Sequence, residues 1–232
     1  MAIQPHRLVL ALVIVAVALF SLARHHAPTA DAGGSVRLDT SGDTIAISDD
    51  QRAAGLTWDP AVAPGDRAWI EQAIATARPE AQRLIAEVDG LVTIHTAPLG
   101  PMIMGATKPG PDRFDVFFNI TQLDGERAID RNVVVLHELG HVIDFSLIDP
   151  ALDGRLDAGI PRPDSCGGTG GPTGACAPAE ERIADTFAKW ALGGAVSAVG
   201  AGYQIPAPPS IEDWGSPLGA IAARLPASTG PS

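Results

Sequence analysis

The sequence has little positive charge. Its 232 residues include 16 Lys and Arg against 27 Asp and Glu, which gives a formal net charge of −11 at pH 7. A protein that binds nucleic acid needs basic groups to neutralise phosphates. The charge balance therefore argues against nucleic acid as a partner. With 46% hydrophobic residues, the composition is typical of one globular domain with tails rather than of two domains with separate cores.

Cysteine is almost absent. The two that occur, Cys166 and Cys176, flank a stretch rich in Gly, Pro and Thr, CGGTGGPTGAC. A zinc site built on these cysteines would need two more ligands, and no histidine lies beyond His141. In an exported protein such a pair predicts a disulfide that closes the loop. The alternative is two unconnected thiols.

One long apolar run occurs, LVLALVIVAVALFSLA at residues 8–23. A spanning helix needs about 20 apolar residues, with roughly 17 as the lower limit, so the run fits either a signal peptide or a short membrane anchor. Residues 1–23 are therefore expected to direct the chain out of the cytoplasm. If they are not cleaved, they make the membrane a partner. The oligomeric state has no signature in the sequence.

Two stretches of different composition flank the folded part. Residues 24–44 are rich in Ala, Gly, Asp, Ser and Thr and predict a flexible linker. Residues 205–232 are rich in proline and predict a loosely ordered tail. The folded domain is then expected over residues 45–204.

Three segments of this domain have the hydrophobic spacing of helices, namely 66–88, 131–145 and 179–192. Pro79 should kink or split the first, because proline cannot donate a backbone hydrogen bond. Asp130 is a suitable N-cap for the second. The second segment is apolar on nearly every face, which indicates a buried helix.

Two further segments, LVTIHT at 91–96 and FDVFFNI at 114–120, are rich in β-branched and aromatic residues and predict strands. His95, in the first, is expected to be a paired or exposed strand histidine. Helices and strands in this order indicate an α+β fold.

The motif HELGH, at residues 137–141 of the expected buried helix, indicates a metal-binding site. Helical positions four apart share a face, so His137 and His141 can point their imidazoles at one metal ion. Zinc lowers the pKa of a bound water to near 7, and Glu138 beside it can take the proton as a general base. The alternative is a helix whose histidines only pack or form hydrogen bonds. A polar cluster on an apolar, buried helix is costly without a partner, which disfavours that alternative.

A catalytic zinc also needs a third protein ligand and an open coordination position. The chain has no histidine after His141 and no methionine after Met104. This excludes the extended HExxHxxGxxH motif and the Met-turn that accompanies it. The third ligand of the single expected zinc ion must come from another part of the chain.

The helix expected at 179–192 offers Glu181 and Asp185, which are four residues apart and share a face. Glu181 is predicted to bind the metal and Asp185 to brace a ligand. Glu180 is an alternative third ligand. Asp185 or Asp144 as the third ligand would make the site aspzincin-like, and Asp144 is otherwise suited to orient a histidine.

HELGH followed by the ExxxDxF spacing of Glu181, Asp185 and Phe187 resembles the gluzincin branch of the zincin metallopeptidases, to which thermolysin belongs. The resemblance implies a zincin-like fold, with a small twisted sheet on the active-site helix and a second ligand-bearing helix downstream. It implies that Glu181 is the third zinc ligand and that Asp185 accepts the free ring N–H of His137. The sequence departs from thermolysin because 39 residues separate His141 from Glu181 and no later histidine is present. HELGHVID is also similar to the catalytic domain of lethal-factor-like toxins.

The only tyrosine, Tyr203, is the candidate to stabilise an oxyanion, and the alternative is a tyrosine at the edge of the core. The resemblance also suggests that FDVFFNI is an edge strand that pairs with an extended peptide. These features predict a zinc-dependent metallopeptidase that hydrolyses peptide bonds of extracytoplasmic proteins or peptides. The alternative is a non-catalytic binding module of the cell envelope on the same scaffold.

Overall fold

The computed structural model describes residues 47–48, 55–100, 103–123, 130–166, 173–194 and 203–225. The expected signal or anchor at 1–23 and the linker at 24–44 lie outside these residues. Within the described part, no helix combines the length and the apolar character needed to cross a membrane.

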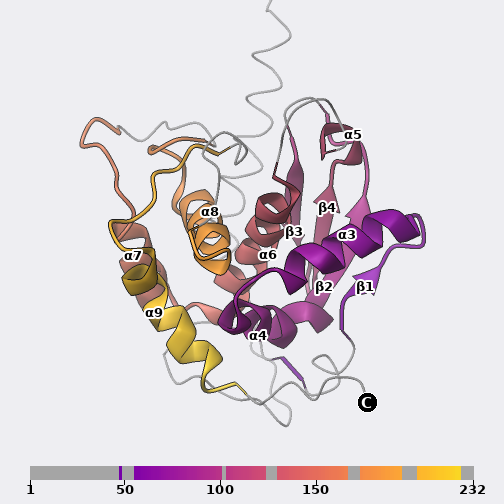
Figure 1. Cartoon of the computed structure of the whole chain (residues 1–232), viewed down its shortest axis with the longest axis horizontal. Coiled ribbons are helices and arrows are strands. Elements are labelled where there is room, and N and C mark those ends of the chain that lie inside the picture. The colour runs from indigo at the N-terminus through magenta and orange to yellow at the C-terminus, as the bar shows by residue number, and fades with distance from the viewer. Residues whose placement is uncertain are drawn as a thin grey trace, which may run out of the picture.

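The described elements are, in chain order, β1 (Thr57–Trp58), α3 (Pro64–Ala75), α4 (Pro79–Val88), the short 3-10 helix η1 (Asp89–Leu91), β2 (Val92–Thr96), β3 (Gly105–Pro109), β4 (Phe114–Phe118), α5 (Ile120–Leu123), α6 (Arg131–Leu147), α7 (Pro150–Ala158), α8 (Ala179–Ala191) and α9 (Ile211–Ala222). They form a mixed fold of one small sheet and surrounding helices (Figure 1). The predicted α+β class is therefore confirmed.

Within the described residues the sheet has four strands, in the order β1-β2-β4-β3. β1, β2 and β4 are parallel, and β3 is antiparallel to β4. Phe114, Val116 and Phe118 of β4 alternate toward the core, which fixes the face that the helices cover. Because β4 lies between β2 and β3, the prediction that FDVFFNI is the edge strand is wrong. The edge strand beside β4 is β3.

α6 lies between α8 and the sheet (Figure 1). Asp130 begins it as predicted, because its carboxylate accepts hydrogen bonds from the backbone N–H groups of Asn132 and Val133. α3 and α8 pack against it, and it also contacts β3 and β4. Nearly every residue from Val133 to Leu147 is buried, as expected for a helix that is apolar all round.

The helix expected at 66–88 is split. α3 ends at Ala75, and α4 begins at Pro79, which occupies the first helical position, where its missing N–H costs nothing. The backbone N–H of Arg78, between the two helices, donates to the carbonyl oxygen of Ala191 at 2.8 Å. This bond ties the break to the end of α8.

The expectation of a loosely ordered tail at 205–232 is wrong over α9. Ser210 caps this helix, and Trp214 is buried with its ring N–H donating to the carbonyl oxygen of Leu156 at 2.9 Å. α9 packs against α4 and α8. The apolar side chains of its inner face outweigh the proline inside it, Pro217, whose cost to a helix misled the sequence interpretation.

Candidate metal centre

His137 and His141 lie one turn apart on the face of α6 that meets α8. Both side chains are buried, and their Nε2 atoms are 3.1 Å apart. Burial lowers the pKa of His137 to about 4, against a smaller opposing effect of the Asp185 charge. His137 is therefore neutral near pH 7, which is the form of imidazole that binds a metal.

Glu181 of α8 completes the group. Its Oε2 lies 3.3 Å from Nε2 of His137, and its Oε1 lies 3.8 Å from Nε2 of His141. The ligand atoms of these three residues all lie within 4.8 Å of one another. Glu180, the alternative ligand, is not part of this group.

A close approach of the two helices brings Glu181 within reach. The G of HELGH is Gly140, and a Cβ at that position would lie 3.1 Å from both Cα of Ala184 and Cδ1 of Phe187. A larger residue would therefore push α8 away. Since Glu181 is one turn before Ala184 on α8, the glycine positions the carboxylate over the histidines.

The three donors fit a metal ion. A tetrahedral ion with ligands at about 2.0–2.1 Å places its donor atoms about 3.3 Å apart. The observed separations of 3.1, 3.3 and 3.8 Å are close to that value. Burial also raises the pKa of Glu181, against a smaller opposing effect of His141, so a bound cation would stabilise its carboxylate. The group of His137, His141 and Glu181 could thus hold a metal ion.

Glu138 is buried on the side of α6 that faces β3. The hydroxyl of Thr107 donates to Oε2 of Glu138 at 2.8 Å and also lies 3.0 Å from the main-chain oxygen of the same residue. Gly105 leaves room for the carboxylate, because a Cβ there would lie 2.5 Å from Oε1. Burial, reinforced by the negative charge of Glu181, raises the pKa of Glu138 to about 8. The side chain is therefore oriented and readily holds a proton.

Tyr203 reaches the same place from beyond α8, as the sequence interpretation required of an oxyanion donor. Its ring stacks on that of His137 with centroids 3.8 Å apart, and its hydroxyl lies 3.5 Å from Oε1 of Glu138. Burial raises the pKa of Tyr203 well above its usual value, and the Glu138 charge adds to the shift. The phenol therefore stays protonated and can donate a hydrogen bond.

Asp185 is fully buried on α8, but it is paired differently from the expectation. Its Oδ2 accepts a hydrogen bond from the ammonium group of Lys189 at 2.5 Å. Among the described residues, neither Oδ1 of Asp185 nor Nδ1 of His137 has a hydrogen-bond partner. The expected bond between these two atoms is therefore not formed. Asp144 is also buried on α6, outside the group of metal ligands.

Arg182 was not anticipated from the sequence. Its guanidinium is fully buried and donates to Oδ1 of Asp157 and to the carbonyl oxygens of Ala175 and Ile160, each at 2.7 Å. It thereby connects α8 to the end of α7 and to the disulfide loop between Cys166 and Cys176. Helical arginines are usually solvated, so the residue after Glu181 carried no signal of this role.

The predicted disulfide is confirmed. Cys166 and Cys176 are bonded with their Cα atoms 5.3 Å apart. The bond closes the loop that carries Ala175, the acceptor of Arg182, and Gly174, whose N–H donates to the carbonyl oxygen of Tyr203. The disulfide loop therefore contacts both α8 and the backbone of Tyr203.

His95 belongs to the sheet and not to the metal centre. Its two ring nitrogens lie 2.8 Å from Asp59 and 3.0 Å from Asp115, and its ring stacks on Phe117. It is a paired strand histidine, one of the two outcomes expected from the sequence.

Comparisons of the chain with protein-family models, with curated proteins and with solved structures found no match. A function can therefore be inferred only from the residues of the chain and their geometry.

Proposed function

We propose that the chain is a zinc-dependent metallopeptidase with a zincin-like, gluzincin-type site. The proposal rests on one observation: the donor atoms of the buried His137 and His141 and of the partly buried Glu181 lie within 4.8 Å of one another, close to the buried Glu138. Two histidines and one glutamate are the ligand set of thermolysin-type catalytic zinc sites, and this set leaves a coordination position open. A zinc ion held by these three residues would supply an acidified water and polarise a carbonyl group.

The residues around the ligands have the roles that hydrolysis needs. Glu138 would take the proton of an attacking water on its carboxylate and pass it to the departing amine, because its side chain lies close to the ligand group and is held in place. Thr107 fixes the direction of that carboxylate. Tyr203 donates its hydroxyl proton in a hydrogen bond to the oxygen that gains negative charge in the transition state.

A peptide substrate is supported by the position of β3. This strand is at one end of the sheet order, and its residue Thr107 contacts Glu138. Among the described residues no strand pairs with the other side of β3. An extended peptide can bind such an edge by adding a strand, which brings its backbone beside the general base. We therefore favour peptide bonds over other amides as the substrate.

We further propose that the enzyme works outside the cytoplasm. The disulfide between Cys166 and Cys176 supports this location, because such bonds persist in oxidising compartments. The apolar run at 8–23 supports it as an export signal or membrane anchor.

The metal site is tested by comparing two neighbouring glutamates. The full chain, purified in mild detergent, should bind one equivalent of zinc, measured by metal analysis after removal of free ions. Glu181→Ala should lose most of this zinc, whereas Glu180→Ala, the matched control, should keep it. Equal zinc content in the two variants would remove Glu181 from the site.

The reaction is tested with Glu138→Gln on a library of quenched fluorescent peptides. We expect wild type to cleave at least one class of peptide, a chelator to stop cleavage, and added zinc to restore it. Glu138→Gln should bind zinc normally and lose activity by about 100-fold or more, because general-base catalysis typically contributes 10²–10⁴-fold. A zinc-loaded wild type that cleaves no peptide would favour the non-catalytic binding module instead.

A further inference from the structure

The segment Tyr203–Ile205 brings the phenol to the metal centre, and its backbone is held under constraint. Gln204 has φ of 53°, in the left-handed region that residues other than glycine adopt uncommonly. Such a conformation persists only where surrounding contacts determine it. The contacts on either side of Gln204 therefore set where the Tyr203 ring lies.

Two contacts flank this residue. On one side, the backbone N–H of Gly174 donates to the carbonyl oxygen of Tyr203 at 2.5 Å. On the other side, the ammonium group of Lys189 donates to the carbonyl oxygen of Ile205. Lys189 has a fixed position of its own, because its side chain is only 13% exposed and also pairs with the fully buried Asp185.

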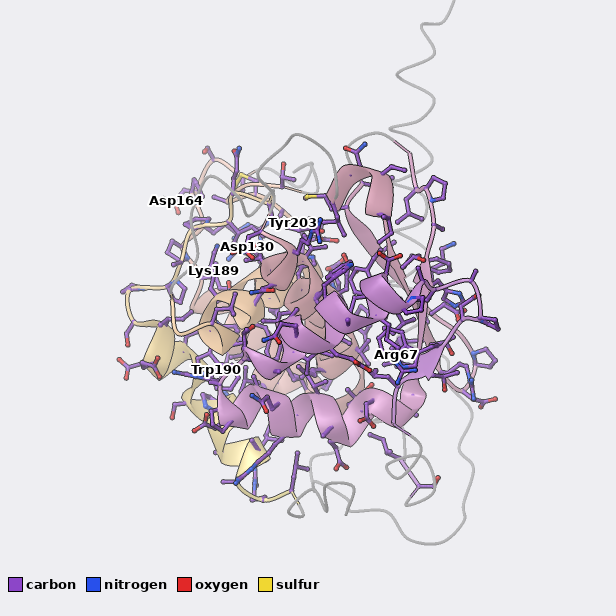
Figure 2. The ribbon with its side chains drawn as sticks, turned by 45° about the vertical axis from the view of Figure 1, so that its right-hand side comes forward. Arg67, Asp130, Asp164, Lys189, Trp190 and Tyr203 are labelled. Atoms are coloured by element: carbon purple, nitrogen blue, oxygen red, sulfur yellow. A yellow bond between two sulfur atoms is a disulfide. The ribbon has the colours of Figure 1, made fainter. Side chains whose placement is uncertain are left out.

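We propose that Lys189 is a positioning residue that holds Tyr203 over the metal ligands by joining α8 to the backbone of Ile205. Lys189 and Tyr203 lie on the same side of the molecule in Figure 2. The ammonium group suits this task, since one flexible side chain supplies three donors and can serve a carboxylate and a carbonyl together. Because α8 also carries Glu181, one helix fixes both the third ligand and the phenol. The catalytic consequence of this placement rests on the proposed function, but the placement itself does not.

The composition of the chain allows a direct test. Tyr203 is its only tyrosine, so selective ¹³C labelling of tyrosine rings gives one signal in an NMR spectrum of the full chain. The chain has two lysines, Lys108 and Lys189. Lys108 lies over the ring of Phe117 on the sheet, 4.8 Å from its centroid, and provides a matched control.

In wild type the stacking on His137 should displace the Tyr203 ring signal from its value in an unfolded chain. Lys189→Met should move this signal toward the unfolded value, whereas Lys189→Arg, which keeps the donors, should restore most of the displacement. Lys108→Met should leave the signal unchanged. An unchanged signal in a folded Lys189→Met variant overturns the proposal.

A second measurement decides the case in which Lys189→Met does not fold. In wild type the two lysines give two ¹⁵Nζ ammonium signals, and the one lost in Lys189→Arg belongs to Lys189. We expect its protons to exchange slowly with water because they are engaged by Asp185 and Ile205. Exchange as fast as that of Lys108 overturns the proposal.

Measurements of peptide hydrolysis distinguish the proposed peptidase function from the proposed positioning role of Lys189. If the chain cleaves a library peptide, Lys189→Met should lower kcat by about tenfold or more with little change in KM, since a small misplacement of a catalytic group is costly. In the background of Tyr203→Phe, the same change should cause little further loss. Equal losses in both backgrounds count against Lys189 acting through Tyr203. A tyrosine signal that moves as expected in a protein that cleaves nothing refutes the peptidase and retains the positioning role.

Discussion

The acidic side chains near the centre of the molecule are compensated in different ways. Thr107 orients the Glu138 carboxylate by a neutral hydrogen bond, whereas Lys189 neutralises Asp185 with a charge. Glu181 lies against two histidines, of which His137 has a pKa of about 4 and supplies no positive charge near neutral pH. Because desolvation raises the pKa of Glu181 despite the opposing effect of His141, a bound cation would stabilise this carboxylate, and the ligand geometry fits such an ion.

Asp89, at the end of α4, is an acidic residue that is compensated only in part. Its Oδ1 is buried and has no hydrogen-bond partner among the described residues. Burial raises the pKa of Asp89 from 3.8 to about 6, although a hydrogen bond from the backbone N–H of Gly90 opposes the shift, and the charge of Glu87 adds to it. Below pH 3.8 the carboxyl is protonated in the folded and the unfolded chain, so it costs nothing. Ionisation in the folded state becomes a growing penalty between about pH 4 and 6 and a full one above that range.

Asp89→Asn should therefore stabilise the protein at pH 7.5 and leave it almost unchanged at pH 4. We expect a gain of about 1 kcal/mol in the free energy of unfolding, less than the pKa shift alone implies, because the half-exposed side chain is screened by water. Urea unfolding at the two pH values measures it. Asp112→Asn, at an exposed carboxylate, is the control and should change little at either pH. A gain of the same size at both pH values would show that ionisation is not its cause.

At the scale of helices and strands, the packing of α6 on α8 decides whether the metal ligands meet. Gly140→Ala would place a methyl group 3.1 Å from the backbone of Ala184 and from Phe187. Overpacking of this kind costs about 1–3 kcal/mol. Because α8 carries Glu181, the displaced helix should also weaken zinc binding, by roughly tenfold or more if one ligand is lost.

The matched control for this prediction is Gly154→Ala. Gly154 lies inside α7, and a Cβ there meets nothing within 4 Å. Alanine is the better helix former, so this variant should gain about 0.5–1 kcal/mol. Thermal unfolding and zinc titration of both variants make the comparison. If Gly140→Ala retained wild-type zinc affinity, the close approach at Gly140 would not be what positions Glu181.

The sequence was sufficient to predict the elements whose hydrophobic spacing is long and regular. The buried helix α6 and the amphipathic helix α8 lie within two residues of the expected bounds, because their apolar side chains repeat over three or more turns. β3 was missed since GATKP has no run of β-branched residues and ends in proline. α7 was also missed, although Asp149 followed by Pro150 is a typical helix start.

The ligands of the candidate metal centre could also be predicted from regular spacing along helices, but the residues around them could not. His137 and His141 could be predicted as ligands because they lie one turn apart on one helix. Glu181 could be predicted because it shares a helix face with Asp185 on α8, the helix that packs against α6. The contacts of Thr107, Lys189 and Arg182 could not be derived, because each joins elements whose relative position only the fold determines. Spacing along one element carries no information about such partners.

At the scale of the whole molecule, the disulfide loop joins parts that are distant in the chain. It contacts Arg182 on α8 through Ala175 and the backbone of Tyr203 through Gly174. Replacing Cys166 and Cys176 together by serine should lower the free energy of unfolding by about 2.5–3 kcal/mol, as loop-closure entropy predicts for a ring of this size. The urea midpoint of the variant, set beside that of oxidised wild type, measures the loss, and reduced wild type should show a similar one. A reduced wild type as stable as the oxidised form would mean that Arg182 alone holds the loop.

The last described helix, α9, packs against α4 and α8 (Figure 1). Trp214 is its main contact, buried and bonded to the carbonyl oxygen of Leu156. Trp214→Ala should therefore cost about 3–5 kcal/mol, the usual range for removing a buried tryptophan. Glu212→Gln, which removes the exposed ion pair with Arg78, should change the free energy of unfolding little, because water screens such a pair.

Both variants should keep the zinc affinity of wild type in their folded fraction, because neither residue contacts a ligand. Urea unfolding with and without zinc separates the two effects: the stability of apo Trp214→Ala falls, while the increment that a saturating excess of zinc adds stays the same. If that increment shrank with the loss of Trp214, the ligand geometry would depend on the support of α8 from outside as well as on its packing against α6.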